Sequence, residues 1–397
     1  MPLDLVQTLS DLVAIPSVNP MGRPLDGPEF YEERVTDYLQ RFFERLKLPW
    51  QRQPVEPRRE NIIARLDGDP SPGDGGQLIM LEAHQDTVPV DGMTIEPWKP
   101  QVCDGRLYGR GACDIKGGMT AMLGALTRLA EERPARRPTV IMACTVNEEY
   151  GYSGASELHK LWAAGANGFV PRRPDAAIVA EPTDLQVVVA HKGAVRWRCR
   201  THGRAAHSSQ PERGDNAVYK MARVLAALEA FASQVGQAVP EHRLCGRATL
   251  SVGLIQGGLS VNTVPDVCTI EIDRRLLPGE EAMDAYQRAV EFVRQHTGDD
   301  RAVEHEPPYL KGTALADRDN GPLADRLVDV TRQVLGRGEK IGVSYGTNAS
   351  RISPTGVPTV VFGPGSISQA HTADEWLSLD ELTKASDVLY AFLKSCL

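Results

Sequence analysis

The sequence predicts an α/β protein in which a doubly wound, mostly parallel sheet forms the larger domain and a ferredoxin-like (βαββαβ) domain is inserted into it. Three observations favour this organisation. Residues 1–190 alternate short apolar runs with helical segments, as open α/β sheets do. Residues 191–306 carry strands that alternate apolar and polar side chains, which is typical of half-exposed antiparallel sheets. The first pattern returns in 307–397, so the larger domain is predicted to be discontinuous.

The elements of the larger domain each have a local signal. Residues 78–84 and 139–146 are continuous apolar runs, as expected of strands that are covered on both faces. Residues 116–132 begin with two glycines and then repeat Met and Leu at helical spacing, which predicts a buried helix. The same reasoning predicts a strand at 176–181, a helix at 322–336, a strand at 358–365 and a last helix after 378–380.

The inserted segment follows the order strand, helix, strand, strand, helix, strand. This order is that of the split ferredoxin-like unit. The predicted strands lie at 194–203, 248–257, 266–277 and 302–307, and the predicted helices at 216–232 and 280–297.

Composition excludes several classes of protein. A net charge of −8 argues against a surface for nucleic acid or for an anionic membrane. No apolar run reaches the ~18 residues that a membrane-spanning helix needs. Seven cysteines without a Cys-x-x-Cys pair predict reduced thiols, and the acidic N-terminus is unlike a secretory signal. We therefore expect a cytoplasmic protein that binds neither nucleic acid nor membrane.

Acids and histidines gather where the predicted strands of the larger domain end. Because open α/β sheets bind ligands outside the carboxyl ends of their strands, these groups are expected to share one crevice. They come from five separate segments: His84 and Asp86, Asp114, Glu148 and Glu149, Glu181, and His371.

So many like charges in one crevice would repel one another unless cations neutralise them. Mixed imidazole and carboxylate ligands without cysteine suit zinc, with cobalt or manganese as alternatives. Two metals ~3.5–4 Å apart, bridged by a carboxylate and a water, would use this number of ligands. Other motifs are absent: no G-x-S-x-G occurs, residues 305–309 do not match H-E-x-x-H, and 108–114 fail G-x-G-x-x-G, which argues against an oxidoreductase.

Eight short motifs resemble one family of enzymes along nearly the whole chain. They are "HQDTVP", "DGRLYGRGACDIKGG", "NEEYGYSGA", "AEPT", "GRAAHSS", "VNTVPD", "IDRRLLPGE" and "GPGS…AHTADE", in the family's order and spacing. The family is that of the dinuclear-zinc amidohydrolases and exopeptidases, which includes acetylornithine deacetylase, succinyl-diaminopimelate desuccinylase, glutamate carboxypeptidase and aminoacylase. The resemblance implies that 1–190 and 307–397 form a zinc-dependent catalytic domain and that 191–306 form a lid and dimerisation domain.

The resemblance also implies roles for the acids and histidines. His84 and Glu181 would bind one metal and Glu149 and His371 the other, while Asp114 would bridge both metals. Asp86 would orient the imidazole of His84, and Glu148 would be the general base that moves a proton from the bridging water to the leaving amine. A cis peptide bond is expected between Asp114 and Ile115.

In the lid, the resemblance implies that His207 stabilises the tetrahedral oxyanion in the partner subunit's active site. Asn262 and Arg275 would grip the α-carboxylate of the substrate, and the D-x-R-x-x-P frame favours Arg275 over its neighbour Arg274. Gly346 precedes a position where the family usually has an acid, whereas this chain has Asn348. We expect this change to remove a charge beside the pocket.

The function that the resemblance implies is removal of an acyl group from an N-acyl amino acid by a hydroxide bound to two metals. N-acetylornithine, and so arginine biosynthesis, is the first candidate, and N-succinyl-diaminopimelate is the second. A metallo-carboxypeptidase or dipeptidase acting on short peptides is the third. A non-catalytic, amino-acid-binding relative is a further alternative, but a protein that only binds has no need of a base such as Glu148.

Overall fold

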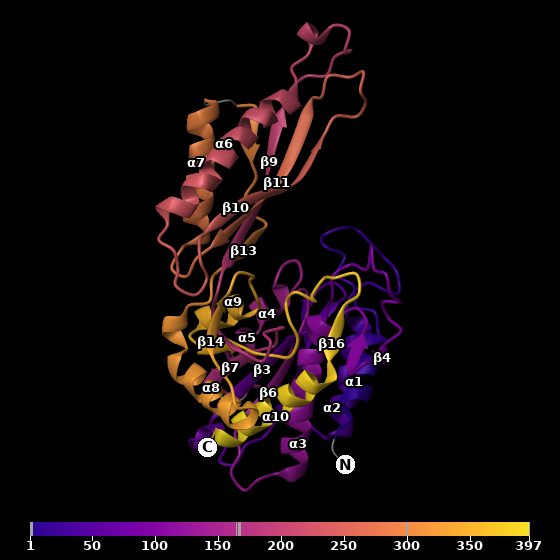
Figure 1. Ribbon diagram of the computed structural model, residues 1–397, viewed down its shortest axis with the longest axis vertical. Helices are drawn as coiled ribbons and strands as arrows, with labels where there is room; N and C mark the ends of the chain where they lie inside the picture. The colour runs from indigo at the N-terminus through magenta and orange to yellow at the C-terminus, as the bar shows by residue number, and fades with distance from the viewer. Residues whose placement is uncertain (1–2, 164, 166–167, 299–300, 397) are drawn as a thin grey trace. The chain divides into compact units, whose positions relative to one another are not determined.

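The chain folds into two compact units (Figure 1). The computed structural model describes residues 3–163, 165, 168–298 and 301–396. Unit 1 comprises Met1–Val189, Asp317–Ile341 and Thr347–Leu397, and unit 2 comprises Ala190–Ala316 and Gly342–Gly346. The predicted boundaries were 190/191 and 306/307, so the structural division falls close to the first and ten residues beyond the second.

Unit 1 is built on an eight-stranded sheet whose centre is parallel, as predicted. The central strands β6, β3, β7 and β15 run parallel, and the β1–β2, β2–β6 and β15–β8 pairs are antiparallel. β3 and β6 are buried at every residue because helices cover both of their faces. In sheet order the strands are β1 (Trp50–Glu56), β2 (Arg59–Leu66), β6 (Thr139–Thr145), β3 (Leu78–His84), β7 (Ala176–Val179), β15 (Thr359–Val361), β8 (Val187–His191) and β14 (Lys340–Val343).

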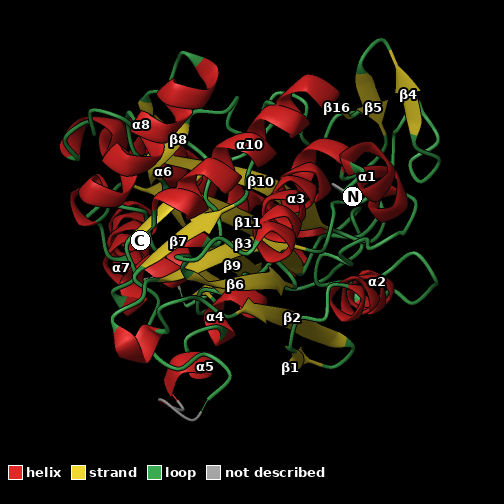
Figure 2. Ribbon diagram, turned by 90° about the horizontal axis from the view of Figure 1, so that it is seen from below, coloured by secondary structure: helices red, strands yellow, loops and turns green. Residues whose placement is uncertain are grey.

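Helices lie on both faces of this sheet, which makes it doubly wound (Figure 2). On one face lie α1 (Leu5–Val13), α3 (Gly117–Glu132), α8 (Gly321–Leu335) and α10 (Leu379–Ser395), and on the other α2 (Glu33–Arg45), α4 (Ser153–Glu157) and α5 (Lys160–Ala163). A further short helix, α9 (Ala349–Ile352), packs against α4. Among the residues that the structure describes, no helix has the length and apolarity to cross a membrane.

A small second sheet in unit 1 joins two distant segments of the chain. It consists of β16 (Trp376–Ser378), β5 (Arg106–Tyr108) and β4 (Gln101–Cys103), in that order. The β16–β5 pair places Glu375 beside the turn that follows β5, where Gly109 donates its backbone N–H to the carbonyl of Glu375. Sequence patterns did not predict this sheet because its strands have only three residues each.

Unit 2 has the predicted ferredoxin-like arrangement of two helices on an antiparallel sheet. The strand order is β10-β11-β9-β12, and β13 also pairs with β9. Trp197 is fully buried and packs edge-on against Tyr286 of the second helix. The elements in chain order are β9 (Gly193–His202), α6 (Ala217–Ala238), β10 (Thr249–Gly257), β11 (Val267–Leu276), α7 (Ala282–Thr297), β12 (Val303–His305) and β13 (Leu310–Gly312).

Candidate active site

Two groups of ligand atoms meet at the carboxyl edge of the unit 1 sheet. His84, Asp114 and Glu181 form one group, and Asp114, Glu149 and His371 form the other; within each group the ligand atoms lie within 4.8 Å of one another. His84 is the last residue of β3, Glu149 follows β6, and Glu181 follows β7. These are the same two sets of residues that the resemblance implied as ligands.

Asp114 is shared between the groups through its two oxygens. Its Oδ1 lies 3.2 Å from Nε2 of His84, and its Oδ2 lies 3.3 Å from Nε2 of His371. The same nitrogen of His371 lies 3.3 Å from Oε2 of Glu149. A carboxylate oriented in this way is suited to bridge two cations. The peptide bond between Asp114 and Ile115 is cis, which confirms that expectation.

The tautomer of His84 is fixed by the main chain of Asp86. Nδ1 of His84 lies 2.9 Å from the backbone carbonyl oxygen of Asp86 and 3.7 Å from its carboxylate. Because a carbonyl oxygen only accepts, Nδ1 carries a proton, which leaves Nε2, on the side of Asp114, as the ring nitrogen that can serve as a metal ligand. Asp86 was predicted to orient the imidazole of His84. It does so chiefly through its backbone carbonyl.

The Asp86 side chain has a different task, which explains how two adjacent glutamates enter one crevice. Its Oδ1 accepts the backbone N–H of Glu148 and its Oδ2 that of Glu149, both at 3.1 Å. Asn147 turns the chain just before them with a left-handed φ of 60°, a conformation that asparagine adopts at low cost. Asn19 supplies a further hydrogen bond to Oδ2 of Asp86 at 2.8 Å. This turn ends the strict alternation of the strand.

Burial dominates the electrostatics of the cluster. Burial raises the pKa of Glu148 and Glu181 well above the usual range, and it raises that of Glu149 to about 7, with neighbouring carboxylates adding to the rise. Burial alone would also raise the pKa of Asp114, but hydrogen bonds from His371 and His84 outweigh it and lower the pKa. An excess of buried carboxylates of this kind suits a site that binds cations.

Glu375 organises the loop that carries Asp114, and sequence reasoning assigned it no role although it ends the "AHTADE" motif. Its Oε1 accepts the backbone N–H groups of Cys113 and Asp114, each at 2.9 Å. Its Oε2 accepts the N–H of Gly111 and pairs with Arg110 at 2.7 Å. Both oxygens of this fully buried carboxylate are therefore used to hold the bridging residue's backbone.

Asn348 lies inside unit 1, where its amide complements a buried acid. The residue is fully buried, and its Nδ2 donates to Oε1 of Glu82 at 2.9 Å and to Oγ1 of Thr145 at 3.0 Å. Glu82 lies on β3, two residues before His84, and burial raises its pKa to about 7. An acid at 348 would meet the Glu82 carboxylate, so the amide is the side chain that complements it here.

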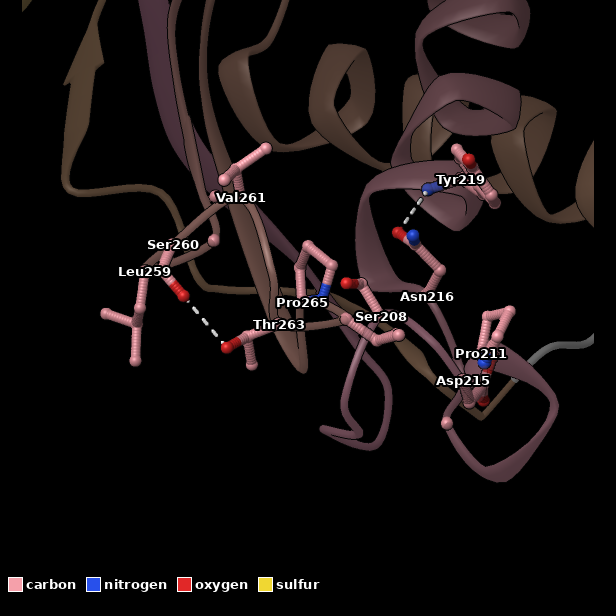
Figure 3. Close-up of a pocket in the computed structure, with 14 residues that line it drawn as sticks. Ser208, Pro211, Asp215, Asn216, Tyr219, Leu259, Ser260, Val261, Thr263 and Pro265 are labelled. Carbon is pink, nitrogen blue, oxygen red and sulfur yellow. Dashed lines mark hydrogen bonds between the residues drawn. The ribbon is translucent and has the colours of Figure 1, made fainter.

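Two residues predicted to act from the lid, His207 and Asn262, lie on neighbouring loops of unit 2. Ser208 donates its backbone N–H to the carbonyl of Asn262 at 3.0 Å, and His207 forms an isolated bridge with Thr263. These loops border a cavity of about 840 Å³ (Figure 3). Beside it, Leu259 is 94% exposed and Val261 fully exposed, as expected of a loop that contacts something else.

The alternation of β11 separates the two neighbouring arginines of unit 2. Arg274 is 1% exposed and is committed to an ion pair with Glu280 at 2.7 Å. Arg275 points to the other face, is partly exposed and pairs with Asp273 at 2.9 Å. Gly346 is the last residue of the shorter of the two segments of unit 2, Gly342–Gly346. Of the two arginines, Arg275 is the one whose guanidinium is accessible, in agreement with the sequence frame.

Paired groups of imidazole and carboxylate ligands at this edge of an α/β sheet, with Glu148 held beside them, define a metal-dependent hydrolase. Comparison with known proteins gives the family. The protein-family model described as peptidase family M20/M25/M40 matches residues 80–395 of this chain. The chain belongs to this family.

Known proteins are similar to this chain over most of its length. Acetylornithine deacetylase of Edwardsiella ictaluri is 32% identical over 388 residues, which cover 95% of this chain and 94% of that protein. Acetylornithine deacetylase of Myxococcus xanthus is 32% identical over 333 residues, covering 83% and 82%. An M20 family metallo-carboxypeptidase of Sulfolobus solfataricus has a similar fold, with a TM-score of 0.79 at 18% identity and 99% coverage of both chains.

Glu375→Gln is expected to weaken metal binding. The amide would turn an N–H₂ donor towards backbone N–H donors and leave the Asp114 loop without its organising charge. We expect a loss of about 10- to 100-fold in metal affinity, the range typical of residues that orient ligands. Isothermal titration of metal-depleted protein with zinc measures this. Asp380→Asn, which removes an exposed carboxylate paired with Lys384, is the matched control, and equal affinities in both variants would contradict the role.

Asn348→Asp is expected to destabilise unit 1 because two carboxylates would then meet in a buried site. The cost is expected to be about 1–3 kcal/mol, the range for an unsatisfied buried polar group. If Glu82→Gln is added, the amide of residue 82 can donate to the new carboxylate at 348, which is the native hydrogen bond with donor and acceptor exchanged. The double variant should therefore recover much of the lost stability. Thermal unfolding of the two single variants and the double variant tests this, and strictly additive losses would contradict a direct Glu82–Asn348 interaction.

Proposed function

We propose that the protein removes the acyl group from an N-acyl amino acid, with Glu148 as the general base. The observation that carries this proposal is the position of Glu148: its backbone is pinned by Asp86 next to Glu149, yet it belongs to neither ligand group. Burial holds its pKa well above the usual value. A carboxyl group with a raised pKa takes up a proton more readily than an exposed glutamate does, as a general base must.

The chemistry of the donor set supports two divalent metal ions at the paired groups. Oε1 of Glu149 is buried without a hydrogen-bond partner among the described residues, as a ligand atom awaiting its ion would be. Two imidazoles and three carboxylates without a thiolate favour zinc, with cobalt or manganese as alternatives. When bound, such ions polarise an amide carbonyl and lower the pKa of water to about 7.

The chain's own residues divide the remaining work. Glu148 takes a proton from the attacking water on its carboxylate and passes it to the nitrogen of the leaving amine. Asp86 keeps Glu148 and Glu149 apart by binding both backbone amides, and His84 keeps its Nε2 towards the metal position because Nδ1 is occupied by a carbonyl. Asp114 stays ionised because two imidazoles face its oxygens.

The lid residues are proposed to recognise the substrate. Asn262 and Arg275 would bind the α-carboxylate, Gly346 would line the same region, and His207 would stabilise the oxyanion of a partner subunit. Residues 257–265 form an exposed loop that pairs with the loop of His207. The two loops together supply the surface that contact with a partner subunit needs.

We further propose that unit 2 forms a homodimer. β10 ends its sheet, so one edge of its backbone is open to a second strand. Leu254 and Ile255 on that strand are exposed. Beside it, α6 and β10 line a mainly apolar cavity of about 560 Å³ with Ala222, Leu225, Ala226, Leu250 and Val252 among its residues. Pairing of two β10 edges would cover this surface, and a cytoplasmic location agrees with the seven free cysteines.

The names of the relatives make N-acetylornithine the first substrate to test. N-succinyl-diaminopimelate and short peptides are the second and third candidates, and one structural neighbour, human carnosine dipeptidase 1, is named for a dipeptide activity (TM-score 0.76, 16% identity, 98% of this chain and 95% of that chain). A non-catalytic binding protein remains the alternative of another class. The retained Glu148, which such a protein would not need, favours catalysis.

Glu148→Gln should lose at least about 10²–10⁴-fold in kcat, the range for a general acid–base group, and keep its metal. Glu149→Gln should instead lower the metal content itself. Activity is measured with added zinc or cobalt on N-acetylornithine, other N-acetyl amino acids, N-succinyl-diaminopimelate and dipeptides, and metal content by elemental analysis. Equal turnover in Glu148→Gln and the unmodified protein would overturn the mechanism.

His207→Ala should lose activity alone but recover part of it when mixed with a metal-ligand variant such as His371→Ala. In a heterodimer, one site would combine intact metal ligands with the partner's intact His207. Activity is followed after subunit exchange, and the formation of mixed dimers is verified by native mass spectrometry. No recovery in verified heterodimers would count against action across subunits.

A further inference from the structure

Arg351 carries a guanidinium that unit 1 leaves without an acidic partner. The side chain is half-buried on α9, and its Nε is buried without a hydrogen-bond partner within the described part of the chain. The Nε atoms of Arg65 and Arg110 are also buried without a partner, but the guanidinium groups of these residues pair with Asp67 and Glu375. Arg351 differs from them in having no acidic partner among the described residues.

The contact that Arg351 does make is with the ring of Tyr152, at 5.4 Å from the centroid. A cation–π contact of a partly exposed arginine is weak compared with the cost of a buried N–H that has no acceptor. Burial also lowers the pKa of the guanidinium, because removal from water disfavours its charged form. The packing alone does not account for an arginine here, since an apolar side chain could lie against the same ring.

The location of Arg351 connects it to the active-site edge from two sides. Tyr152 lies three residues after Glu149, and its backbone N–H donates to the carbonyl of Asn147 at 2.7 Å. On the other side, α9 starts directly after Asn348, whose amide is anchored to Glu82 on the strand of His84. α4 and α9 lie side by side in unit 1 (Figure 1). Both supports of the Arg351 side chain are thus continuous with residues of the ligand groups.

We propose that Arg351 binds a second carboxylate of the substrate, one other than the α-carboxylate. The planar guanidinium presents parallel N–H donors that match a carboxylate, and its buried Nε has no hydrogen-bond partner among the described residues. The inference rests on the proposed deacylation and, unlike the names of the relatives, ranks an N-acyl amino acid with an extra carboxylate ahead of N-acetylornithine. That carboxylate can belong to the acyl group, as in an N-succinyl amino acid, or to the side chain, as in N-acetylglutamate.

The two sources are distinguished by substrate pairs that differ only in this charge. N-acetylglutamate is compared with N-acetylglutamine, and N-succinylmethionine with its terminal amide, in the zinc-loaded full-length protein. Arg351→Gln should lower kcat/KM for the charged member of one pair by about 10- to 100-fold, the factor for a charge-assisted hydrogen-bonded pair. The neutral member should change less than about threefold, and Arg351→Lys should fall between.

The control is Arg128→Gln, which removes an arginine that also lies over a tyrosine ring but has Glu132 and Asp387 as partners. It should leave all four kcat/KM values unchanged. If Arg351→Gln lowers both members of each pair equally, or neither, the role in carboxylate binding is overturned and the residue only supports the fold. A preference of the unmodified protein for N-acetylornithine over both charged substrates would overturn it as well.

Binding separates this inference from the proposed reaction. Calorimetric titration of Glu148→Gln with the same four compounds reports affinity without turnover, with and without Arg351→Gln. Arg351-dependent selectivity for a charged compound, without hydrolysis by the unmodified protein, would refute the deacylase proposal and keep the carboxylate site. Hydrolysis without that selectivity would support the deacylase proposal and refute the carboxylate site. If neither charged compound binds, the carboxylate site is refuted as well.

Discussion

The site depends on one constraint: several carboxylates must be held close together in a buried crevice although they repel one another. The protein meets this constraint by fixing backbones rather than by pairing each acid with a base. Asp86 binds the amides of two adjacent glutamates, and Glu375 binds the amides around Asp114. Both are buried acids whose oxygens point at N–H groups of neighbouring loops. The charge that remains is left for cations.

Much of this arrangement was predictable from the sequence because its signals are local. The strands that carry His84 and precede Glu149 are apolar runs followed by polar residues, and the positions of these residues at one sheet edge follow from parallel pairing. The eight motifs predicted the five residues that the structure brings together as candidate ligands and the cis bond after Asp114. Unit 2 was predictable in the same way, since burial alternates along β11 and along most of β9.

What the sequence did not predict depends on contacts between distant segments. Glu375 acts on a loop 261 residues earlier in the chain, and Asn348 meets a glutamate 266 residues away. Nothing in the neighbourhood of either residue indicates such a partner. The expectation for Asn348 considered the charge of that position alone, whereas the carboxylate that the amide complements is supplied by Glu82 on β3.

The order of segments in the sheet has a consequence for biosynthesis. β15 is made after the whole lid, yet it lies between β7 and β8, which are made before it. His371 and Glu375 follow β15. A nascent chain that has released only its first two hundred residues therefore has an open gap in its central sheet, a bridging loop without its organising acid and an incomplete ligand set. The group of His84, Asp114 and Glu181 has all its residues early in synthesis, whereas the group of Asp114, Glu149 and His371 is complete only when the chain is almost finished.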